Sequence, residues 1–179
     1  RMSGCPLPVV INSGSGNQGI TVTLPVVVYG KYYGIPQEKI YRALCVSNLI
    51  SVHQKRFIGS LSAYCGATSA ACGSGAGIAY MLGMTYEEIC DVITNSIATI
   101  GGMICDGAKA SCAAKIAAAV ETALVAVHMA KKHRAFKNGE GLVKDNVEDT
   151  IATVGDMGRV GMKSTDVEIL NLMLDKKNV

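Results

Sequence analysis

The sequence predicts a mainly α-helical protein: one compact helical bundle over residues 1–179, with a buried helix of small residues and glycine-rich site loops. Three observations support this fold class. Hydrophobic residues make up 49% of the 179 residues and charged residues only 17%, apolar residues recur at helical spacing, and twenty Gly accompany two Phe and no Trp. A chain of this length forms one domain with its own core. That core must be built from aliphatic and small side chains.

The N-terminal part begins with a loop and continues with an element of mixed signals. Residues 1–20 are rich in Pro, Gly and Ser and indicate a loop. Residues 20–29 are β-branched and resemble a strand by propensity. Pro25 argues against a central strand and would be tolerated in the first turn of a helix, so both interpretations stay open here. Pro36 fits the first turn of a helix that reaches about Phe57.

Two helices are predicted next along the chain. A glycine-flanked break over residues 59–66 precedes a helix of small residues from about Ala67 to Leu82. Thr85 and Glu88 have the spacing of a capping box, which predicts the start of the following helix. The Gly pair at 101–102 is expected to end it.

The C-terminal part is predicted to hold three more helices. Asp106 is a good N-cap for the longest helix, over about residues 107–133. A shorter helix is expected over about residues 146–154. Thr165 and Glu168 form a second capping-box pattern, which predicts a last helix ending near Lys176.

Composition excludes several classes of protein. The net charge of +3 is small and evenly spread, which argues against nucleic-acid binding. The stretch from Phe57 to Tyr86 carries no charge and raises the question of a membrane span, but its many Gly and Ser residues favour a buried helix instead. Seven cysteines are an odd number, so we expect no disulfide framework and a cytoplasmic protein with free thiols, metal ligands or catalytic cysteines.

Four of the cysteines form two pairs, Cys65 with Cys72 and Cys105 with Cys112, each seven residues apart. On one helix this spacing is about 10.5 Å of rise, too far for both members to bind one compact cluster. Cys65 and Cys105 lie in predicted loops before helices, and Cys112 lies near a helix N-terminus, which favours thiolates. We therefore rank these three as metal ligands and Cys72 as a packed core residue.

Other interpretations of the cysteines remain open. All of them could be core residues, since free cysteines are commonly buried. Zinc is a rival metal, but no His lies nearby in sequence and a structural zinc site needs four ligands. A fourth ligand at Cys72 or Cys90 would favour a non-catalytic iron–sulfur domain. Three ligands would leave one iron open, which is the arrangement a Lewis acid needs.

Three blocks of sequence carry a resemblance to a known family: residues 12–20 (NSGSGNQGI), 59–66 (GSLSAYCG) and 102–115 (GMICDGAKASCAAK). From Ser3 to about Leu174 the chain resembles the L-cysteine desulfidases and the alpha-type catalytic domain of iron–sulfur L-serine dehydratases. The resemblance implies a helical domain with a 4Fe–4S cluster on three cysteines. Those positions correspond to Cys65, Cys105 and Cys112.

The resemblance also implies an activity and a partner. The family reaction is β-elimination on a small amino-acid substrate, giving pyruvate, ammonia and either hydrogen sulfide or water. The short separation of the last two cysteines, and the lack of a cysteine near residue 179, favour L-cysteine over L-serine or L-threonine. Desulfidase-like proteins are longer, so we expect a further N-terminal half or second subunit as partner; a homo-oligomer is also compatible with the sequence.

Further residues are candidates for the site. The segment Ser13, Gly14, Ser15, Gly16, Asn17 and Gln18 resembles an anion cradle for the amino-acid carboxylate, although an ordinary glycine-rich turn has the same composition. Lys109 lies three residues before Cys112 and is a candidate base or carboxylate ligand, or else a solvated residue. Ser62, near Cys65, is a candidate for a hydrogen bond to substrate. His53 and Lys55 precede the loop of Cys65; a direct role for either is the less favoured interpretation, because surface and core histidines are common.

Overall fold

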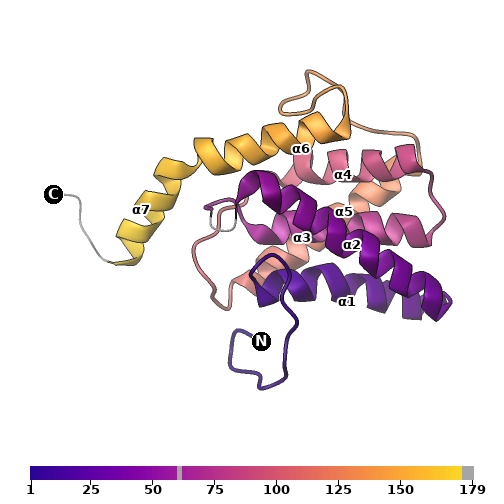
Figure 1. Cartoon of the computed structure of the whole chain (residues 1–179), viewed down its shortest axis with the longest axis horizontal. Coiled ribbons are helices and arrows are strands. Elements are labelled where there is room, and N and C mark those ends of the chain that lie inside the picture. The colour runs from indigo at the N-terminus through magenta and orange to yellow at the C-terminus, as the bar shows by residue number, and fades with distance from the viewer. Residues whose placement is uncertain (60–61, 175–179) are drawn as a thin grey trace.

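The computed structural model describes residues 1–59 and 62–174 and confirms a mainly helical fold (Figure 1). These residues form α1 (Gly16–Tyr32), α2 (Gln37–Ile58), α3 (Gly66–Met81), α4 (Tyr86–Ile100), α5 (Cys112–Ala130), α6 (Val147–Asp156) and α7 (Lys163–Met173). A π-helical turn, η1 (Met157–Gly161), joins α6 to α7. Over the same residues the structure has two isolated β-bridges and no strand.

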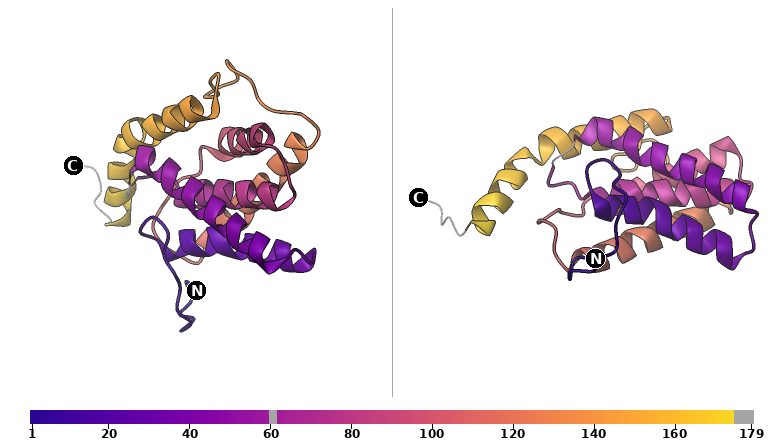
Figure 2. Two further views of the ribbon diagram at one scale, coloured as in Figure 1. Left: turned by 45° about the vertical axis from the view of Figure 1, so that its right-hand side comes forward. Right: turned by 60° about the horizontal axis from the view of Figure 1, so that its bottom comes forward.

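The predicted helix of small residues, α3, lies at the centre of the bundle. It packs against α1, α2, α4 and α5, and nearly all of its residues are buried (Figure 2). Its glycines allow a close approach to α2, because a Cβ atom on Gly77 would lie 2.7 Å from the carbonyl oxygen of Ala43. A Cβ atom on Gly73 would likewise clash with the carbonyl oxygen of Ser47, also on α2. The uncharged stretch that raised the membrane question is therefore a core helix.

Residues 20–29, which resemble a strand by propensity, are helical in the structure. This segment belongs to α1, with Pro25 in the middle of the helix rather than in its first turn. Val22 and Val26, one helical turn apart, are completely buried, and Val26 packs in a cluster with Ile40 and Met81. Packing at helical spacing outweighs the β propensity of the individual residues.

The helix predicted over residues 107–133 is shorter than expected. It begins at Cys112 and ends at Ala130, so α2, with 22 residues, is the longest helix in the described part of the chain. Asp106 is not its N-cap; Ser111 takes that position, without a side-chain hydrogen bond. Gly107 has a φ of 90°, which no continuing helix can contain, so the helix cannot begin before it.

The two capping-box patterns have different outcomes. Thr85 and Glu88 form a complete capping box at the start of α4. Thr165 lies inside α7, which begins at Lys163 and has no side-chain cap. The π-helical turn η1 leads from α6 almost directly into α7, so no extended residue exists there to act as an N-cap. The predicted end near Lys176 lies outside the described residues.

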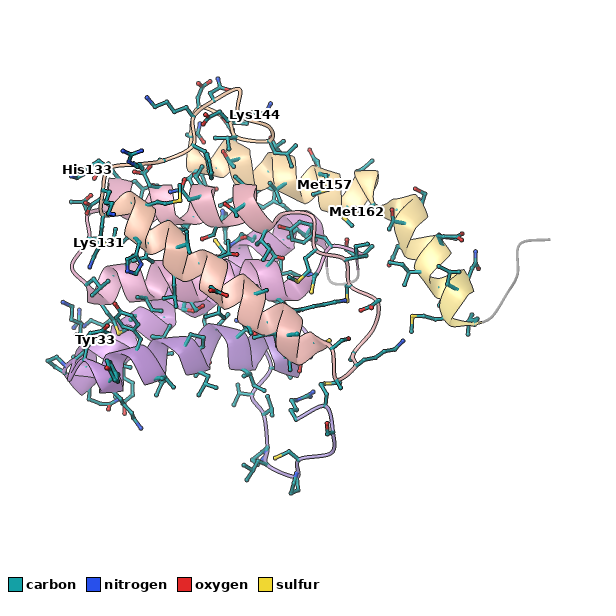
Figure 3. All side chains as sticks on the ribbon, turned by 180° about the vertical axis from the view of Figure 1, so that it is seen from behind. Tyr33, Lys131, His133, Lys144, Met157 and Met162 are labelled. Carbon is teal, nitrogen blue, oxygen red and sulfur yellow. The ribbon has the colours of Figure 1, made fainter. Side chains whose placement is uncertain are left out.

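The remaining helix predictions agree with the structure. The helix expected from Pro36 is α2, and the helix expected over residues 146–154 is α6, with Asn146 as its N-cap. The last helix, α7, extends away from the bundle and buries none of its residues (Figure 1). Figure 3 shows this arrangement from behind, with Met157 and Met162 near the junction where the chain leaves the body.

One described helix, α5, is long and apolar enough to cross a membrane by length and composition alone. Core helices share these properties, and α5 packs on α3 and α4 through a row of buried alanines that includes Ala119, Ala123 and Ala126. Only 22% of its apolar stretch is buried within the described structure, so packing against α3 and α4 covers one side of the helix.

Candidate functional site

The N-termini of three helices, α1, α3 and α5, meet at a cavity of about 200 Å³. Helix N-termini carry partial positive charge and free backbone N–H groups, so this cavity favours anions. Its lining includes three thiols, two lysines, a serine and most of the predicted cradle: Cys65, Cys105, Cys112, Lys55, Lys115, Ser62, Ser13, Gly14, Ser15, Asn17 and Gln18. Within residues 1–59 and 62–174, no Asp or Glu lines it.

Cys65 and Cys105 are brought together by two short segments that pair like strands. Tyr64 and Ile104 form an antiparallel bridge. The backbone N–H of Cys65 donates to Met103 (3.0 Å), and that of Cys105 donates to Ala63 (2.6 Å). Two cysteines forty positions apart in sequence are thereby held side by side.

Cys112 reaches the same cavity from the first residue of α5. Its Sγ lies 3.6 Å from the carbonyl oxygen of Gly107, in the loop that also carries Cys105. Because α5 begins at Cys112 and not at residue 107 as expected, this cysteine lies in the first turn of the helix. The prediction that Cys112 lies near the helix N-terminus is retained.

Cys72 and Cys90 do not line this cavity. Cys72 is completely buried in the core cluster with Ile93 and Ile97, and its Sγ lies 3.8 Å from the carbonyl oxygen of Ile93. Burial raises the pKa of the Cys72 thiol to about 12, so it stays protonated and inert. Its predicted role as a packed core residue is confirmed.

The thiols of the cavity have unequal ionisation. A hydrogen bond from the Cys65 thiol lowers the pKa of Cys105, and the backbone N–H of Gly107 and the charge of Lys115 act in the same direction. The pKa of Cys65 is raised by this hydrogen bond and by burial. Cys105 is therefore the thiol that ionises more readily.

Two lysines line the cavity: Lys115, which the sequence did not single out, and Lys55, for which a direct role was not favoured. Lys115, on α5, donates to the carbonyl oxygen of Ile104 (2.9 Å) and pairs with Asp106. Lys55, on α2, is buried, and burial lowers its pKa while the neighbouring Cys105 and Cys65 oppose that shift. A sequence signal existed for Lys115, three positions after Cys112 and so on the same face of a helix.

The predicted anion cradle is a tight turn followed by a helix N-terminus. Asn12 and Ser15 exchange backbone hydrogen bonds of 3.1 Å around Ser13 and Gly14, whose φ values are 50° and 84°. Ser15 is the N-cap of α1 and accepts from the backbone N–H of Gln18. Of the six residues predicted, only Gly16 does not line the cavity, because the Arg1 side chain lies against it.

The turn is fixed to α2 through the buried side chain of Asn12. Its Nδ2 donates to Asn48 Oδ1 (3.0 Å), and its Oδ1 accepts from the hydroxyl of Ser51 (3.1 Å). These hydrogen bonds hold the loop at the mouth of the cavity.

The two predicted catalytic candidates lie in different places. Ser62 lines the cavity, but its hydroxyl already donates to the carbonyl oxygen of Gly158 (2.6 Å) and accepts from the backbone N–H of Tyr64 (3.0 Å). Lys109 is exposed in the loop before α5 and is not part of the lining. His53 pairs with Glu148 (2.7 Å), also outside the lining.

The donor set suits a sulfur-ligated iron cluster. Soft thiolates are the typical ligands of iron–sulfur clusters, and an anionic cluster is favoured by helix N-termini and lysines. Within the described ranges, no group of three His, Cys, Asp or Glu side chains is placed to hold a single metal ion. The fit to a cluster rests on the three thiols that line the cavity, the donor type that iron–sulfur clusters use.

The fold and this cavity define a class of protein: a helical domain with a cysteine-lined, anion-favouring site. The family model described as serine dehydratase alpha chain matches residues 1–171, and the chain belongs to this family. The predicted family membership is thus confirmed.

Similar proteins extend the comparison. A UPF0597 protein of Desulfitobacterium hafniense is 55% identical over 176 residues, which are 98% of this chain and 41% of the relative. A UPF0597 protein of Lachnoclostridium phytofermentans is 54% identical over 175 residues, again 98% of this chain, and 42% of the relative. The chain thus spans about two fifths of the length of these relatives. No solved structure matches it.

Proposed function

We propose that this chain is the cluster-binding part of a 4Fe–4S-dependent lyase that converts L-cysteine and water to pyruvate, ammonia and hydrogen sulfide. One observation carries the proposal: Cys65, Cys105 and Cys112 line a single cavity at three helix N-termini, while Cys72 lies in the core. Membership of the serine dehydratase alpha chain family supports the class of reaction.

The three cysteines would hold the cluster, and the turn over residues 13–18 would bind the substrate carboxylate. When bound, a cluster with three protein ligands supplies an open iron that acts as a Lewis acid on the leaving group. The backbone N–H of Asn17 has no hydrogen-bond partner within residues 1–59 and 62–174, which suits a carboxylate guest.

The catalytic roles of Ser62 and Lys109 remain proposals. Ser62 is close enough to hydrogen-bond substrate because it lines the cavity. Lys109 requires its exposed side chain to turn inward. Lys115 already lies in the cavity, where its ammonium group is oriented by Asp106 and the carbonyl oxygen of Ile104.

L-serine or L-threonine is the second candidate substrate. The description of the matching family, serine dehydratase alpha chain, favours it. The seven-residue separation of Cys105 and Cys112 favours L-cysteine. Both substrates carry their leaving group on Cβ, so a single site can be tested with each.

We further propose that activity needs the additional part present in the longer relatives, of which this chain matches about two fifths. That part would act as a covalently linked half or as a second subunit. We expect the assembled protein to function in the cytoplasm, where cysteines stay reduced.

The test is anaerobic reconstitution of the chain with iron and sulfide, followed by iron counting and product assays. Pyruvate would be measured with L-cysteine, L-serine and L-threonine, and sulfide with L-cysteine. The full-length relative from Desulfitobacterium hafniense would be assayed in parallel as the complete counterpart.

We expect about four irons per chain, as a 4Fe–4S cluster requires, and sulfide release from L-cysteine by the full-length protein. Pyruvate from L-serine but not L-cysteine would replace the first substrate with the second. Iron binding without turnover of any of the three would favour a non-catalytic iron–sulfur domain. No iron uptake would overturn the proposal.

A further inference from the structure

We infer that the ammonium group of Lys55 binds the carboxylate of the substrate and so restricts the site to ligands that carry a free carboxylate. The identity of the substrate as an amino acid rests on the function proposed above. The inference itself rests on the burial of Lys55, on the lack of a carboxylate partner for it among the described residues, and on its position relative to the turn at residues 12–15.

Lys55 is a buried cation near the thiols of Cys105 and Cys65, and it has no carboxylate partner among the described residues. Its side chain lines the cavity, and the residue is only 8% exposed. In the part of the chain that the structure describes, no carboxylate lies within ion-pairing distance of it, and its ammonium group makes no hydrogen bond. A buried charge is costly unless it is paired, so an anion is expected from the cavity.

Helix α2 places this ammonium group beside the turn. Asn48 and Ser51 hold the turn through Asn12, as described above. Lys55 follows Ser51 by four residues, so the two lie on the same face, one helical turn apart. One face of α2 therefore binds the turn at residues 12–15 and also carries the ammonium group of Lys55 beside it.

The neighbouring groups assign this cation to the substrate more readily than to the cysteines. Cys65 and Cys112 already lie at helix N-termini, and Lys115 is oriented beside them by Asp106 and Ile104. None of the three N–H donors of Lys55 makes a hydrogen bond within residues 1–59 and 62–174. Among the described residues that line the cavity there is no Asp or Glu, so no carboxylate side chain there competes for the ammonium group of Lys55.

The experiment compares Lys55→Met, which keeps the side-chain length without the charge, with Lys55→Arg, which keeps the charge. Arg56→Met is the matched control, since Arg56 is the next residue of α2 and is exposed. Binding of two unreactive probes, L-alanine and ethylamine, would be measured by calorimetry on the reconstituted full chain. These probes differ in the carboxylate, and neither carries a leaving group. Iron content and helicity would be recorded for every variant.

We expect Lys55→Met to weaken L-alanine binding about 10- to 100-fold, as for loss of a hydrogen bond to a charged group, and to leave ethylamine binding and iron content unchanged. Lys55→Arg should retain a larger share of the L-alanine affinity, and Arg56→Met all of it. Wild-type affinity for L-alanine in Lys55→Met, or no binding of L-alanine to the wild-type chain, would overturn the inference.

Loss of iron in Lys55→Met, with normal helicity, would also overturn it, because the cation would then serve the thiolates. Failure of the proposed lyase is a separate result. A wild-type chain that binds L-alanine through Lys55 but produces neither sulfide nor pyruvate when joined to its partner would refute the reaction and leave the carboxylate site standing.

Discussion

The first turn of α3 and its middle are built from the same kinds of residue but have opposite properties. At the first turn, Cys65 and Gly66 face the cavity, and three buried polar atoms nearby lack partners in the described structure: Gln18 Oε1, Tyr64 Oη and Thr68 Oγ1. In the middle, Cys72 and Gly73 are sealed against neighbouring helices. Position along one helix, rather than residue type, thus decides whether a cysteine faces a site or fills the core.

The largest effect should come from replacing a cysteine of the cavity by serine. Cys112→Ser should reduce iron bound after anaerobic reconstitution to near zero, because a hydroxyl is a poor replacement for a soft thiolate ligand. Cys72→Ser should retain the iron, since Cys72 does not line the cavity. Iron per chain is the measurement. Equal iron content in the two variants would remove the distinction between a cysteine that lines the cavity and a cysteine packed in the core.

The next effect concerns the sealed middle of the helix. Gly73→Val should destabilise the fold by about 3 kcal/mol, because overpacking at a close helix contact forces backbone shifts. The new side chain would meet the backbone of α2 at Ser47. Urea unfolding followed by circular dichroism measures this. Gly102→Ala is the control, since a Cβ there meets nothing within 4 Å; a similar loss in both would show that packing against α2 is not the cause.

Local sequence signals were sufficient where the structure depends on neighbours in sequence. The small-residue helix, the capping box at Thr85 and the helix after Asn146 follow from spacing and capping chemistry, and all three are present. The start of α5 was misplaced because Asp106 looked like an N-cap, whereas its carboxylate pairs with Lys115 and Gly107 adopts a positive φ. Neither feature can be recognised from local composition.

The features that local sequence signals did not predict depend on contacts between segments that are distant in the chain. The strand-like propensity of residues 20–29 yields to burial of Val22 and Val26 inside the bundle. The cysteines of the cavity could be ranked from sequence, since each was expected near a helix start. Lys55 could not, because its burial depends on α2 packing beside a turn that lies about forty residues earlier in the chain.

The smallest effect is expected from a change in α4, the helix that packs against the buried part of α3. Thr85→Ala removes the side-chain cap of α4 and should cost about 1 kcal/mol of stability. Thr165→Ala carries the same change at the second pattern, where no cap forms, and should stay within about 0.5 kcal/mol of the wild type. Urea midpoints of the two variants give the comparison.

The iron content of Thr85→Ala shows whether the first turn of α3 and its far end respond together to a change in stability. Thr85 lies at the start of α4 and does not line the cavity, so Thr85→Ala should loosen the packing of α4 against the far end of α3, around Ala79, while leaving bound iron unchanged. If Thr85→Ala lost iron in proportion to its stability, the first turn of α3 and its far end would be one cooperative unit. Retention of iron would show that the cavity depends on its own anchors, the paired segments around Tyr64 and Ile104.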